Sequence, residues 1–296
     1  MLLQYLKTFC RVVDEGSFTR AAESLNLSQP TVTKQVKRLE EELQAELLAR
    51  GRRHLTLTPA GDLVYLHARR ILNTLKDCRA ALDALATPGA GDLSIGAVFT
   101  LTIFLLPRLL EGFKEEHPLV TIYVRSGTNK GILDLVLHNE VDAGLTTVPI
   151  THDQIITRPL YEDKVVLVCS ADSEWAERGS VTPAELSQIP MIGYDRSSQF
   201  RAFVDMHFEA AGVTPNIVME FDSHDAVKAM VQLRLGVAMA PHTAVREDLN
   251  SGRLCALRIE SFPEISRLTS LIVRRDRRRT PALADFIRHV EERFSG

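Results

Sequence analysis

The stretch SLNLSQPTVTKQVKRLEEEL (Ser24–Leu43) decides the fold of the N-terminal region. Ser28 is a favoured helix N-cap, and a proline two residues later suits the first helical turn. One apolar face follows at spacings of four, three and four residues: Val32, Val36, Leu39 and Leu43. The opposite face and the N-terminal tip carry Gln29, Pro30, Thr31, Lys34, Lys37 and Arg38. The pattern predicts a helix that buries one face and exposes polar and cationic groups on the other.

Those exposed groups match the chemistry of DNA recognition. Glutamine can bind adenine through two hydrogen bonds, and a proline or a threonine methyl can contact the thymine methyl. Lysine and arginine bind phosphate or guanine, and the amides at a helix N-terminus favour phosphate. The alternative is a plain solvated helix face, because most charge runs on helices are nothing more. This stretch alone leaves both interpretations open.

Two further helices are predicted before this one. Leu6 and Cys10 belong to an apolar series at helical spacing that Gly16 ends. Ser17 is a plausible N-cap for a short helix that contains Ala21 and Ala22, whose small side chains allow close helix packing. Two helices joined by a short turn, with a polar front on the second, form a helix-turn-helix.

A basic hairpin is predicted directly after the polar helix, in LLARGRRHLTLTPAG (Leu47–Gly61). Leu55 and Leu57 alternate with threonines, as in a β-ribbon, and arginines surround the glycine at the turn: Arg50, Arg52 and Arg53. Such a basic turn, or wing, suits a contact with the DNA backbone or the minor groove. An arginine cluster alone is weak support, but it gains weight directly after a helix-turn-helix.

A long helix is expected from Pro59, and Thr58 is its predicted cap. Apolar residues alternate at spacings of four and three along it: Val64, Ala68, Ile71, Leu75, Cys78, Leu82 and Leu85. We call these seven residues the seam. A seam of this kind predicts a coiled coil and therefore a dimer, whereas a single amphipathic core helix is the alternative. The helix is expected to end at TPGAG (Thr87–Gly91), a hinge-like linker.

The bulk composition limits the classes of protein that fit. A chain of 296 residues with a formal net charge of -3 is not broadly basic, so DNA binding requires a local patch. The four cysteines lie far apart and are expected to be reduced thiols in the cytoplasm. Neither a signal peptide nor a membrane helix is predicted, because charged residues interrupt the N-terminus and the longest apolar run stops at Pro107.

The N-terminal sequence resembles the LysR-type transcriptional regulators. The resemblance rests on FCRVVDEGSFTRAAESLNLSQPTVTKQVKRLEEEL (Phe9–Leu43), on AR at Ala49 and on LTPAG from Leu57. Shorter phrases continue it, such as GDLSIGA and LLPRLLEGFKEEHPLV between Gly91 and Val120, and VDAGL from Val141. Two positions depart from the family pattern: Gln44 replaces a glycine, and Leu48 replaces a phenylalanine. They affect the turn after the polar helix and an aromatic core contact, and they remove no DNA-facing group.

The resemblance implies roles for particular residues. Gln29, Pro30, Thr33 and Lys34 would face bases or nearby phosphates in the major groove, and the three arginines would serve the wing. Arg38 would contact a phosphate or pair with Glu42. The expected DNA-binding set is Ser28, Gln29, Pro30, Thr31, Thr33, Lys34, Lys37, Arg38, Arg50, Arg52 and Arg53. Members of this family bind interrupted palindromes as dimers of dimers, and a small inducer alters how the DNA is bent.

From Asp92 onward, strands and helices alternate, which indicates an α/β fold with parallel sheets covered on both faces. Strands are expected at 93–98, 121–126, 142–147, 164–170, 190–194, 216–221, 237–241 and 270–275. Two crossing strands, KVVLVC and SLIVRR, would suit two lobes joined by a hinge. The resemblance implies the same periplasmic-binding-protein-like arrangement.

A small-molecule site is predicted where these strands end, since ligands of open α/β sheets bind beyond the carboxyl ends of strands. The candidate residues are Thr100, Thr102, Ser126, Thr128, Asn129, Thr147, Arg196, Ser197, Ser198 and His224. Hydroxyls, amides and one arginine around helix N-termini suit a small anion, such as an organic acid or a phosphorylated metabolite. Each residue could equally be a plain helix cap.

The sequence carries no familiar catalytic motif and no metal-ligand spacing, so neither an enzyme nor a cofactor is expected. The predicted organisation is a winged helix-turn-helix domain at 1–58, a coiled-coil linker helix at 59–87, a hinge at 88–91 and an effector domain at 92–296. Its lobe I is expected at about 92–163 and 267–296, and its lobe II at about 164–266.

The function predicted is that of a ligand-responsive transcriptional regulator in the cytoplasm, acting as a dimer or tetramer. Double-stranded DNA and a small anion are its expected partners, RNA polymerase is a candidate, and no membrane is involved. Two alternatives stay open: a nonspecific architectural DNA binder without a ligand, and a transport-type receptor whose N-terminal helices only mediate oligomerisation.

Overall fold

The computed structural model describes residues 2–49, 55–86, 89–277 and 280–294. Its N-terminal domain is a bundle of three helices: α1 (Leu2–Glu15), α2 (Phe18–Leu25) and α3 (Gln29–Leu43). The expected caps are present, since the Ser17 side chain accepts from the backbone N–H of Arg20 and the Ser28 side chain accepts from that of Thr31. The helix-turn-helix predicted from the sequence is thereby confirmed.

The core of this domain follows the predicted helical spacing, with one exception. Val32, Val36 and Leu39 of α3 are buried against Phe9 and Cys10 of α1. Leu43, predicted to be buried with them, is 40% exposed, so that prediction is wrong. It is the last residue of α3, and Gln44 after it adopts the left-handed conformation at φ 51° and turns the chain away.

A short antiparallel ribbon follows α3, as the alternation of leucine and threonine predicted. Leu48 pairs with Leu57, and the backbone N–H of Ala49 donates to the carbonyl of Thr56 at 2.9 Å. Leu48 is buried in the N-terminal core, at the position where the family usually has phenylalanine. The predicted wing arginines, Arg50, Arg52 and Arg53, lie outside the described residues.

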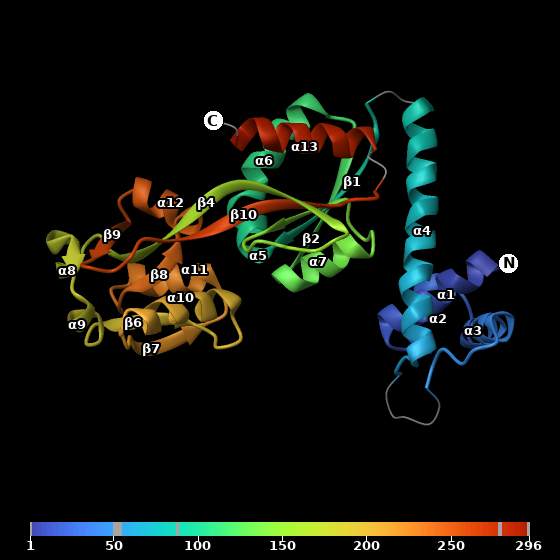
Figure 1. The fold of residues 1–296 in the computed structure, drawn as a ribbon, viewed down its shortest axis with the longest axis horizontal. Coiled ribbons are helices and arrows are strands. Elements are labelled where there is room, and N and C mark those ends of the chain that lie inside the picture. Colours follow the sequence, from blue (N-terminus) through green and yellow to red (C-terminus); the bar gives the residue numbers. More distant parts are fainter. Residues whose placement is uncertain (1, 50–54, 87–88, 278–279, 295–296) are drawn as a thin grey trace.

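The long helix α4 (Pro59–Ala86) begins where the sequence predicted. Thr58 caps it by accepting a hydrogen bond from the backbone N–H of Gly61 at 2.9 Å. Only glycine fits at position 61, because a Cβ there would lie 2.0 Å from the carbonyl oxygen of Leu47. In Figure 1, α4 stands beside the effector domain with α1–α3 packed around its N-terminal half.

Lobe I of the effector domain is built on one end of the large sheet. Its strands are β1 (Gly91–Val98), β2 (Val120–Gly127) and β3 (Ala143–Thr146), and its helices are α5 (Phe99–Phe104), α6 (Leu106–Glu116), α7 (Asn129–Leu137) and α13 (Pro281–Phe294). Helices α6 and α13 cover one face of the sheet and α7 covers the other (Figure 1). Phe113 and Phe286 meet edge to face in the core, with ring centroids 5.5 Å apart.

Lobe II has its own hydrophobic core. Its strands are β5 (Ser180–Val181), β6 (Pro190–Tyr194), β7 (Asn216–Phe221), β8 (Ala238–Pro241) and β9 (Leu254–Ile259). Its helices are α8 (Glu174–Arg178), α9 (Pro183–Leu186), α10 (Gln199–Ala210), α11 (His224–Gln232) and α12 (His242–Asn250). Strands β6 and β7 form a separate parallel pair, whereas β8 and β9 join the large sheet through β4.

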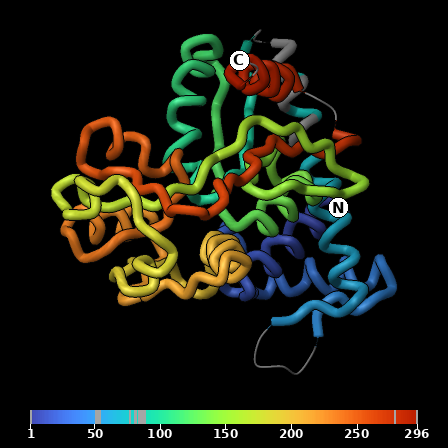
Figure 2. The backbone as a smooth tube through the Cα atoms, turned by 60° about the vertical axis from the view of Figure 1, so that its left-hand side comes forward, coloured from blue at the N-terminus to red at the C-terminus, as the bar shows by residue number. Residues whose placement is uncertain are grey.

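Two long strands, β4 (Ile155–Ser170) and β10 (Ile265–Arg274), run between the lobes. They pair with each other in antiparallel fashion from Ile155 to Val165, with a register shift at Thr269/Ser270. Figure 2 shows them side by side over this length, in yellow-green and red. The predicted crossing strands are therefore present, and the fold is a two-lobed α/β effector domain.

The expectation of purely parallel sheets is wrong. β1 is parallel to β2 and β3, but β10 is antiparallel to both β3 and β4, and β8 and β9 are antiparallel to β4. The reason for β10 is topological. β4 carries the chain from lobe I to lobe II and β10 carries it back, so the two strands run in opposite directions. All eight expected strands are present, whereas β5, β9 and the first half of β4 were not predicted.

A polar junction joins α4 to the N-terminal domain and to lobe I. The guanidinium of Arg69 pairs with Asp14 of α1 at 2.9 Å and with Glu140, which follows α7. The Tyr65 hydroxyl also hydrogen-bonds Asp14, and one turn beyond Arg69 the Asn73 amide donates to the His138 carbonyl at 3.1 Å. Three parts of the chain thus meet at a single arginine on α4.

Candidate DNA-binding surface and effector site

The outer face of α3 presents the groups that the sequence predicted there. Ser28, Gln29, Pro30, Thr33, Lys34, Lys37 and Arg38 are exposed, and Thr31 is half-buried. Val32, Val36 and Leu39 point into the core on the other side of the same helix. The domain core therefore fixes which side chains of α3 face solvent.

Hydrogen bonds hold the first turn of this face in place. Ser28 Oγ lies 2.8 Å from Thr31 Oγ1, and Gln29 Nε2 donates to Thr33 Oγ1 at 3.2 Å. Gln29 is exposed, so the other hydrogen-bonding groups of its amide are accessible to solvent. These bonds restrict the rotamers of the tip before any partner arrives.

Arg38 differs from its expected pairing. Its guanidinium lies 3.3 Å from Glu41, one turn away, and not beside Glu42, which was one of the two alternatives expected for it; the other, a phosphate contact, stays a prediction. Both side chains of the pair are at least half exposed, so the interaction is weak and screened by salt. Arg38 can therefore exchange this carboxylate for another anion at small cost.

The predicted seam of α4 divides into two parts. Ala68 is fully buried and Val64 is half-buried, and both pack in the N-terminal core of the same chain. Ile71, Cys78 and Leu82 are exposed, and Leu75 is half-buried. The backbone of Leu85 is helical, but its side chain lies outside the described part of the structure. Apolar surface thus remains uncovered along the C-terminal half of α4.

Two predicted cleft residues bridge the lobes directly. Thr100 Oγ1 of α5 lies 3.0 Å from Nε2 of His224 at the start of α11. The other ring nitrogen of His224 lies 2.9 Å from the Tyr194 hydroxyl, at the end of β6. Burial lowers the pKa of His224 to about 4, and the charges of Arg267 and Lys228 act in the same direction. The imidazole is therefore neutral near pH 7, with one nitrogen donating and the other accepting.

Asn129 forms a second bridge between the lobes. Its Oδ1 accepts from the backbone N–H of Thr147 at 2.9 Å, and its Nδ2 donates to Gln199 Oε1 of α10 at 2.9 Å. Asn129 and Thr147 are both buried. Gln199 was missed from the sequence, although it directly follows the predicted cap Ser198.

Four further predicted residues lie around these bridges: two are helix caps and two bond to each other through their hydroxyls. Thr128 caps α7 by accepting from Gly131 N at 3.1 Å, and Ser198 caps α10 by accepting from Arg201 N at 3.4 Å. Ser126 Oγ donates to Thr102 Oγ1 at 3.1 Å. The cap interpretation that the sequence left open therefore fits Thr128 and Ser198.

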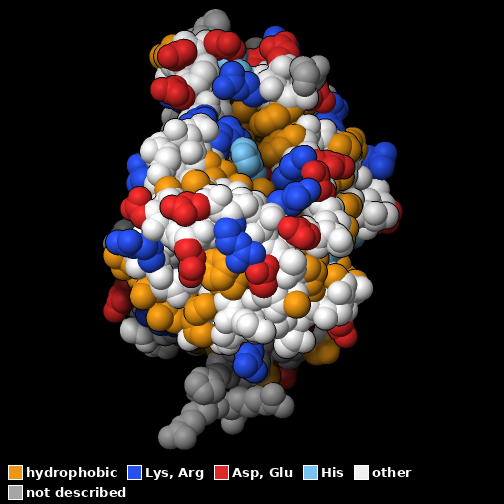
Figure 3. Space-filling model, turned by 90° about the vertical axis from the view of Figure 1, so that its left-hand side faces the viewer, with side chains coloured by type: hydrophobic (Ala, Val, Ile, Leu, Met, Phe, Trp, Pro, Cys, Tyr) orange, Lys and Arg blue, Asp and Glu red, His pale blue; other side chains and the backbone are white. Residues whose placement is uncertain are grey.

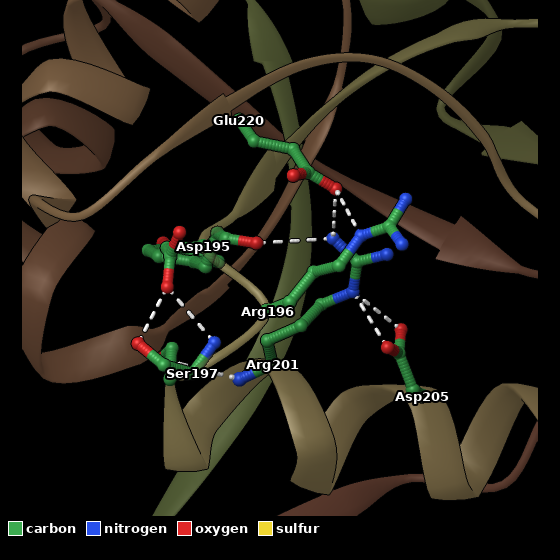
Figure 4. Close-up of polar contacts among 8 residues, drawn as sticks. Asp195, Arg196, Ser197, Arg201, Asp205 and Glu220 are labelled. Carbon is green, nitrogen blue, oxygen red and sulfur yellow. Dashed lines mark hydrogen bonds and ion pairs between the residues drawn. The ribbon is translucent and has the colours of Figure 1, made fainter.

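Arg196 and Ser197 are turned toward their own lobe. Figure 4 shows the Arg196 side chain directed to Glu220 of β7, and its Nε lies 3.7 Å from that carboxylate. Ser197 bonds Asp195 through both its hydroxyl and its backbone N–H, and these bonds lower the pKa of Asp195. Arg196 is 87% exposed, so it belongs to the surface of lobe II and not to the Thr100–His224 bridge.

A buried cation under the bridges was not predicted. Arg267 of β10 is 7% exposed, pairs with Asp163 of β4 at 3.4 Å and lies over the Phe200 ring at 4.8 Å. Its Nε has no hydrogen-bond partner in the described part of the chain. Burial lowers the pKa of Arg267, and Asp163 opposes that effect. No local motif could have revealed it, because the strand pairing alone brings positions 163 and 267 together.

The outer surface of the effector domain offers no comparable concentration of positive charge among the described side chains in view. In Figure 3, which looks onto the lobe II end, Lys and Arg are intermingled with Asp and Glu. The local cation set of α3 thus contrasts with the mixed charges of this lobe II face, in a chain of net charge -3.

Two other kinds of feature are absent from the described residues. No group of three or more His, Cys, Asp or Glu side chains in the described ranges could hold a metal ion. Over the same residues, no helix combines the length and apolarity needed to cross a membrane.

Comparison with known proteins gives a match over nearly the whole chain. Residues 3–62 match the family described as "Bacterial regulatory helix-turn-helix protein, lysR family", and residues 86–295 match "LysR substrate binding domain". The transcriptional regulator GltR of Bacillus subtilis is 29% identical over 99% of this chain and 97% of its own. A probable RuBisCO transcriptional regulator of Synechocystis is 31% identical over 99% of this chain and 86% of its own.

Solved structures share the fold. A full-length OxyR variant from Pseudomonas aeruginosa superposes with a TM-score of 0.73 at 24% identity, covering 98% of this chain and 95% of its own. Full-length CbnR in complex with its target DNA gives 0.70 at 24% identity, covering 99% of both chains. The effector-binding domain of QuiR in complex with shikimate gives 0.58 at 19% identity, over 70% of this chain and 98% of its own.

The matched relatives are named as transcriptional regulators and not as enzymes, in agreement with the expectation from the sequence. A helix-turn-helix with a polar outer face precedes a two-lobed domain in the same order as the two matched families. The chain belongs to the LysR family of DNA-binding transcriptional regulators, with an effector-binding domain behind its helix-turn-helix.

Proposed function

We propose that the outer face of α3 reads an operator in the major groove of double-stranded DNA. Gln29, Pro30 and Thr33 would contact base edges, Lys34 a base or a nearby phosphate, and Lys37 and Arg38 phosphates. Ser28 and Thr31 would hold the helix tip, whose amides favour phosphate. The observation that carries this proposal is the exposure of the whole set on a helix whose opposite face is buried. Arg50, Arg52 and Arg53 would add the wing contact.

The exposed apolar part of α4 supports a dimer. Ile71 and Leu82 are 49% and 61% exposed, which is costly for large apolar side chains left in water. Pairing of two α4 helices along the seam would bury them and place two α3 helices on two half-sites of an interrupted palindrome. A dimer of dimers that acts on RNA polymerase in the cytoplasm completes the proposal.

The cleft between the lobes is the proposed effector site. Its direct bridges, Thr100 to His224 and Asn129 to Gln199, join lobe I to lobe II and would be exchanged for bonds to a ligand. A small anion, such as an organic acid or a phosphorylated metabolite, suits the helix N-termini and the unpartnered Nε of Arg267 beneath them. We place the predicted Arg196 and Ser197 at the rim, not in the pocket.

The proposed domain boundaries remain those expected from the sequence. They are 1–58 for DNA binding, 59–87 for the linker helix, 88–91 for the hinge and 92–296 for the effector domain. Supporting observations are the span of α4 and the two separate hydrophobic cores of the lobes.

A mismatch scan on an operator selected from random DNA tests the recognition surface. Binding of the full chain should lose about 1–3 kcal/mol at each contacted base pair. Gln29→Ala should relax preference at one base pair of each half-site, whereas Lys37→Ala should weaken all sequences alike and lower the salt slope by about 0.9. Equal losses for every base in both variants would contradict the assigned roles and would favour a nonspecific binder.

Effector binding is tested separately by thermal-shift screening of the full chain against organic acids and phosphorylated metabolites. The thermal shift caused by a bound compound should be lost in Thr100→Val and in Asn129→Ala. The Thr100→Val variant should still bind operator DNA. A hit that survives both Thr100→Val and Asn129→Ala would remove these residues from the pocket.

A further inference from the structure

A second cavity lies between the lobes, on the other side of the α5 helix. Its volume is about 290 Å³, at the lower end of small-molecule sites, which begin near ~300 Å³. Lobe I contributes an apolar wall of Ile103, Phe104 and Pro107. Lobe I also contributes Arg108 at the rim, and lobe II contributes Thr243, Ala244, the cations Lys228 and Arg246 and the carboxylates Asp225 and Glu247. The cavity is therefore apolar on one side and charged on the other, where three cations outnumber two carboxylates.

The ionic partners around this cavity leave one cation available. Lys228 is held by Asp225 at 3.1 Å and by the buried Asp248 at 3.2 Å. Arg108 on the rim pairs with Glu247 across the lobes at 3.0 Å. Arg246 is half-buried, and no ion pair or hydrogen bond joins its side chain to another residue in the described ranges. Its guanidinium thus lines the cavity with its donors unused.

Phe104 separates this cavity from the cleft at Thr100. Its ring meets the His224 ring edge to face, with centroids 6.4 Å apart, and Lys228 Nζ lies 4.8 Å from the centre of the same ring. His224 belongs to the Thr100 bridge, whereas Lys228 lines the cavity. The two sites share one aromatic wall and use different polar groups.

We propose that this cavity binds a small organic carboxylate with an apolar body, independently of the effector cleft. The free guanidinium of Arg246 matches a carboxylate in planar, two-bond geometry. A phosphate is a poorer match, because only one unpaired cation is present and the facing wall is apolar. An aryl or branched alkyl group would lie against Phe104 and Ile103, with the carboxylate on Arg246.

A ligand in this cavity would favour the arrangement in which the two lobes lie close together. The ligand would touch α5 and the start of α6 from lobe I and α12 from lobe II, so it binds best when these elements are close. It can shift the lobe equilibrium only by its difference in affinity for the two arrangements. The shared Phe104 wall gives a direct route for one site to affect the other.

Isothermal titration calorimetry of the full chain with benzoate tests the proposal, with benzyl alcohol as the uncharged comparison. We expect benzoate to bind and benzyl alcohol to bind at least tenfold more weakly. Arg246→Gln should weaken benzoate binding by about tenfold or more, and Ile103→Trp should do so by filling the cavity from its exposed rim. Arg293→Gln, which removes an exposed cation from α13, is the matched control and should bind benzoate as the wild type does.

The Thr100→Val variant distinguishes the two sites. It should retain benzoate binding if the ligand lies in the second cavity. Loss of binding in Thr100→Val with retention in Arg246→Gln would place benzoate in the effector cleft and overturn the proposal. Absence of heat at millimolar concentrations of both benzoate and cyclohexanecarboxylate would also overturn it. Thermal melting of each variant checks that the fold is intact, and unchanged operator binding keeps this result separate from the proposed DNA recognition.

Discussion

The outer face of α3 and the interlobe cleft are both polar surfaces, but they are built in opposite ways. On α3 and its N-cap, eight functional side chains come from one stretch of eleven residues (28–38), and all but the half-buried Thr31 are exposed, while the same helix buries its other face. In the cleft, Thr100, Asn129 and His224 come from distant parts of the chain and bond to each other or to unpredicted partners. The α3 face is open to its partner. The polar groups of the cleft already bond to other residues of the protein, so a ligand there must replace some of these hydrogen bonds.

This difference has an energetic consequence. Groups on α3 contribute little to folding, because they make few contacts beyond weak local bonds. Groups at the cleft are buried, so removing one leaves a partner unsatisfied. Substitutions on α3 should therefore change binding and spare stability, and substitutions beneath the cleft should change both.

The largest effect is expected at Asp163, beneath the cleft. Asp163→Ala removes the partner of the buried Arg267 and the acceptor for Thr243, whose N–H and Oγ1 both bond it. The uncompensated charge should lower the free energy of unfolding of the effector domain by about 3–5 kcal/mol, measured by urea denaturation. Glu264→Gln breaks the exposed pair with the neighbouring Lys164 and should leave the midpoint unchanged. Equal effects of the two variants would show that burial of the ion pair does not decide the cost of breaking it.

The next effect is a pH dependence that arises at His224. Its pKa is about 4 in the folded chain against about 6.5 when unfolded, so the unfolded state binds the proton first. Stability contributed by the neutral imidazole is complete above pH 6.5 and is lost as the pH falls toward 4, by up to about 3 kcal/mol.

His224→Gln should flatten this part of the stability profile, measured as the unfolding midpoint at half-unit pH steps. His152→Gln, on the surface of lobe I, should keep the wild-type profile. An unchanged slope in His224→Gln would show that the imidazole titrates freely and that the cleft is open to water.

A gain of stability is expected at the end of α3. Gln44 holds the left-handed conformation at φ 51°, which costs a residue with a Cβ about 1 kcal/mol relative to glycine. Gln44→Gly should raise the stability of the N-terminal domain by roughly that amount in thermal melts of the full chain. Asn26→Gly, at φ 52° after α2, should gain less, because asparagine tolerates this region. A loss of stability at position 44 would mean that its side chain makes a compensating contact.

The smallest effect is expected from Glu41. Glu41→Gln releases Arg38 from its exposed pair, so operator affinity should rise by about twofold at low salt and return to the wild-type value at high salt. Fluorescence anisotropy at two salt concentrations measures this. A rise that persists at high salt would point to a change in helix conformation and not to a released cation.

Much of the fold could be predicted from local sequence patterns. The caps at Ser17, Ser28 and Thr58 and the apolar spacing of α3 each depend on residues within one or two turns. The eight strands expected from short apolar runs between turn residues are likewise present, although β5 and β9 were not predicted.

Most errors arose where distant segments meet. The direction of β10 depends on the path back from lobe II. The error at Leu43 is local, because the left-handed turn at Gln44 follows it directly. At the cleft, strand ends gave Thr100, Asn129 and His224, but not their hydrogen-bond partners Gln199 and Tyr194, nor the Arg267–Asp163 ion pair beneath them. Arg196 followed the same rule and nevertheless turned to Glu220, since the nearest opposite charge lies in its own lobe.

The length of α4 gives the Arg69 junction mechanical leverage. A helix of 28 residues is about 42 Å long, and its N-terminal half carries the α3 helix while Arg69 ties it to Glu140 of lobe I. A rotation of about 10° around its far end displaces the near end by roughly 7 Å, about two base-pair rises of 3.4 Å. Arg69 lies between that far end and the N-terminal end of α4, so in the proposed DNA complex a shift of lobe I that moves Arg69 would move the α3 helix further still along the double helix.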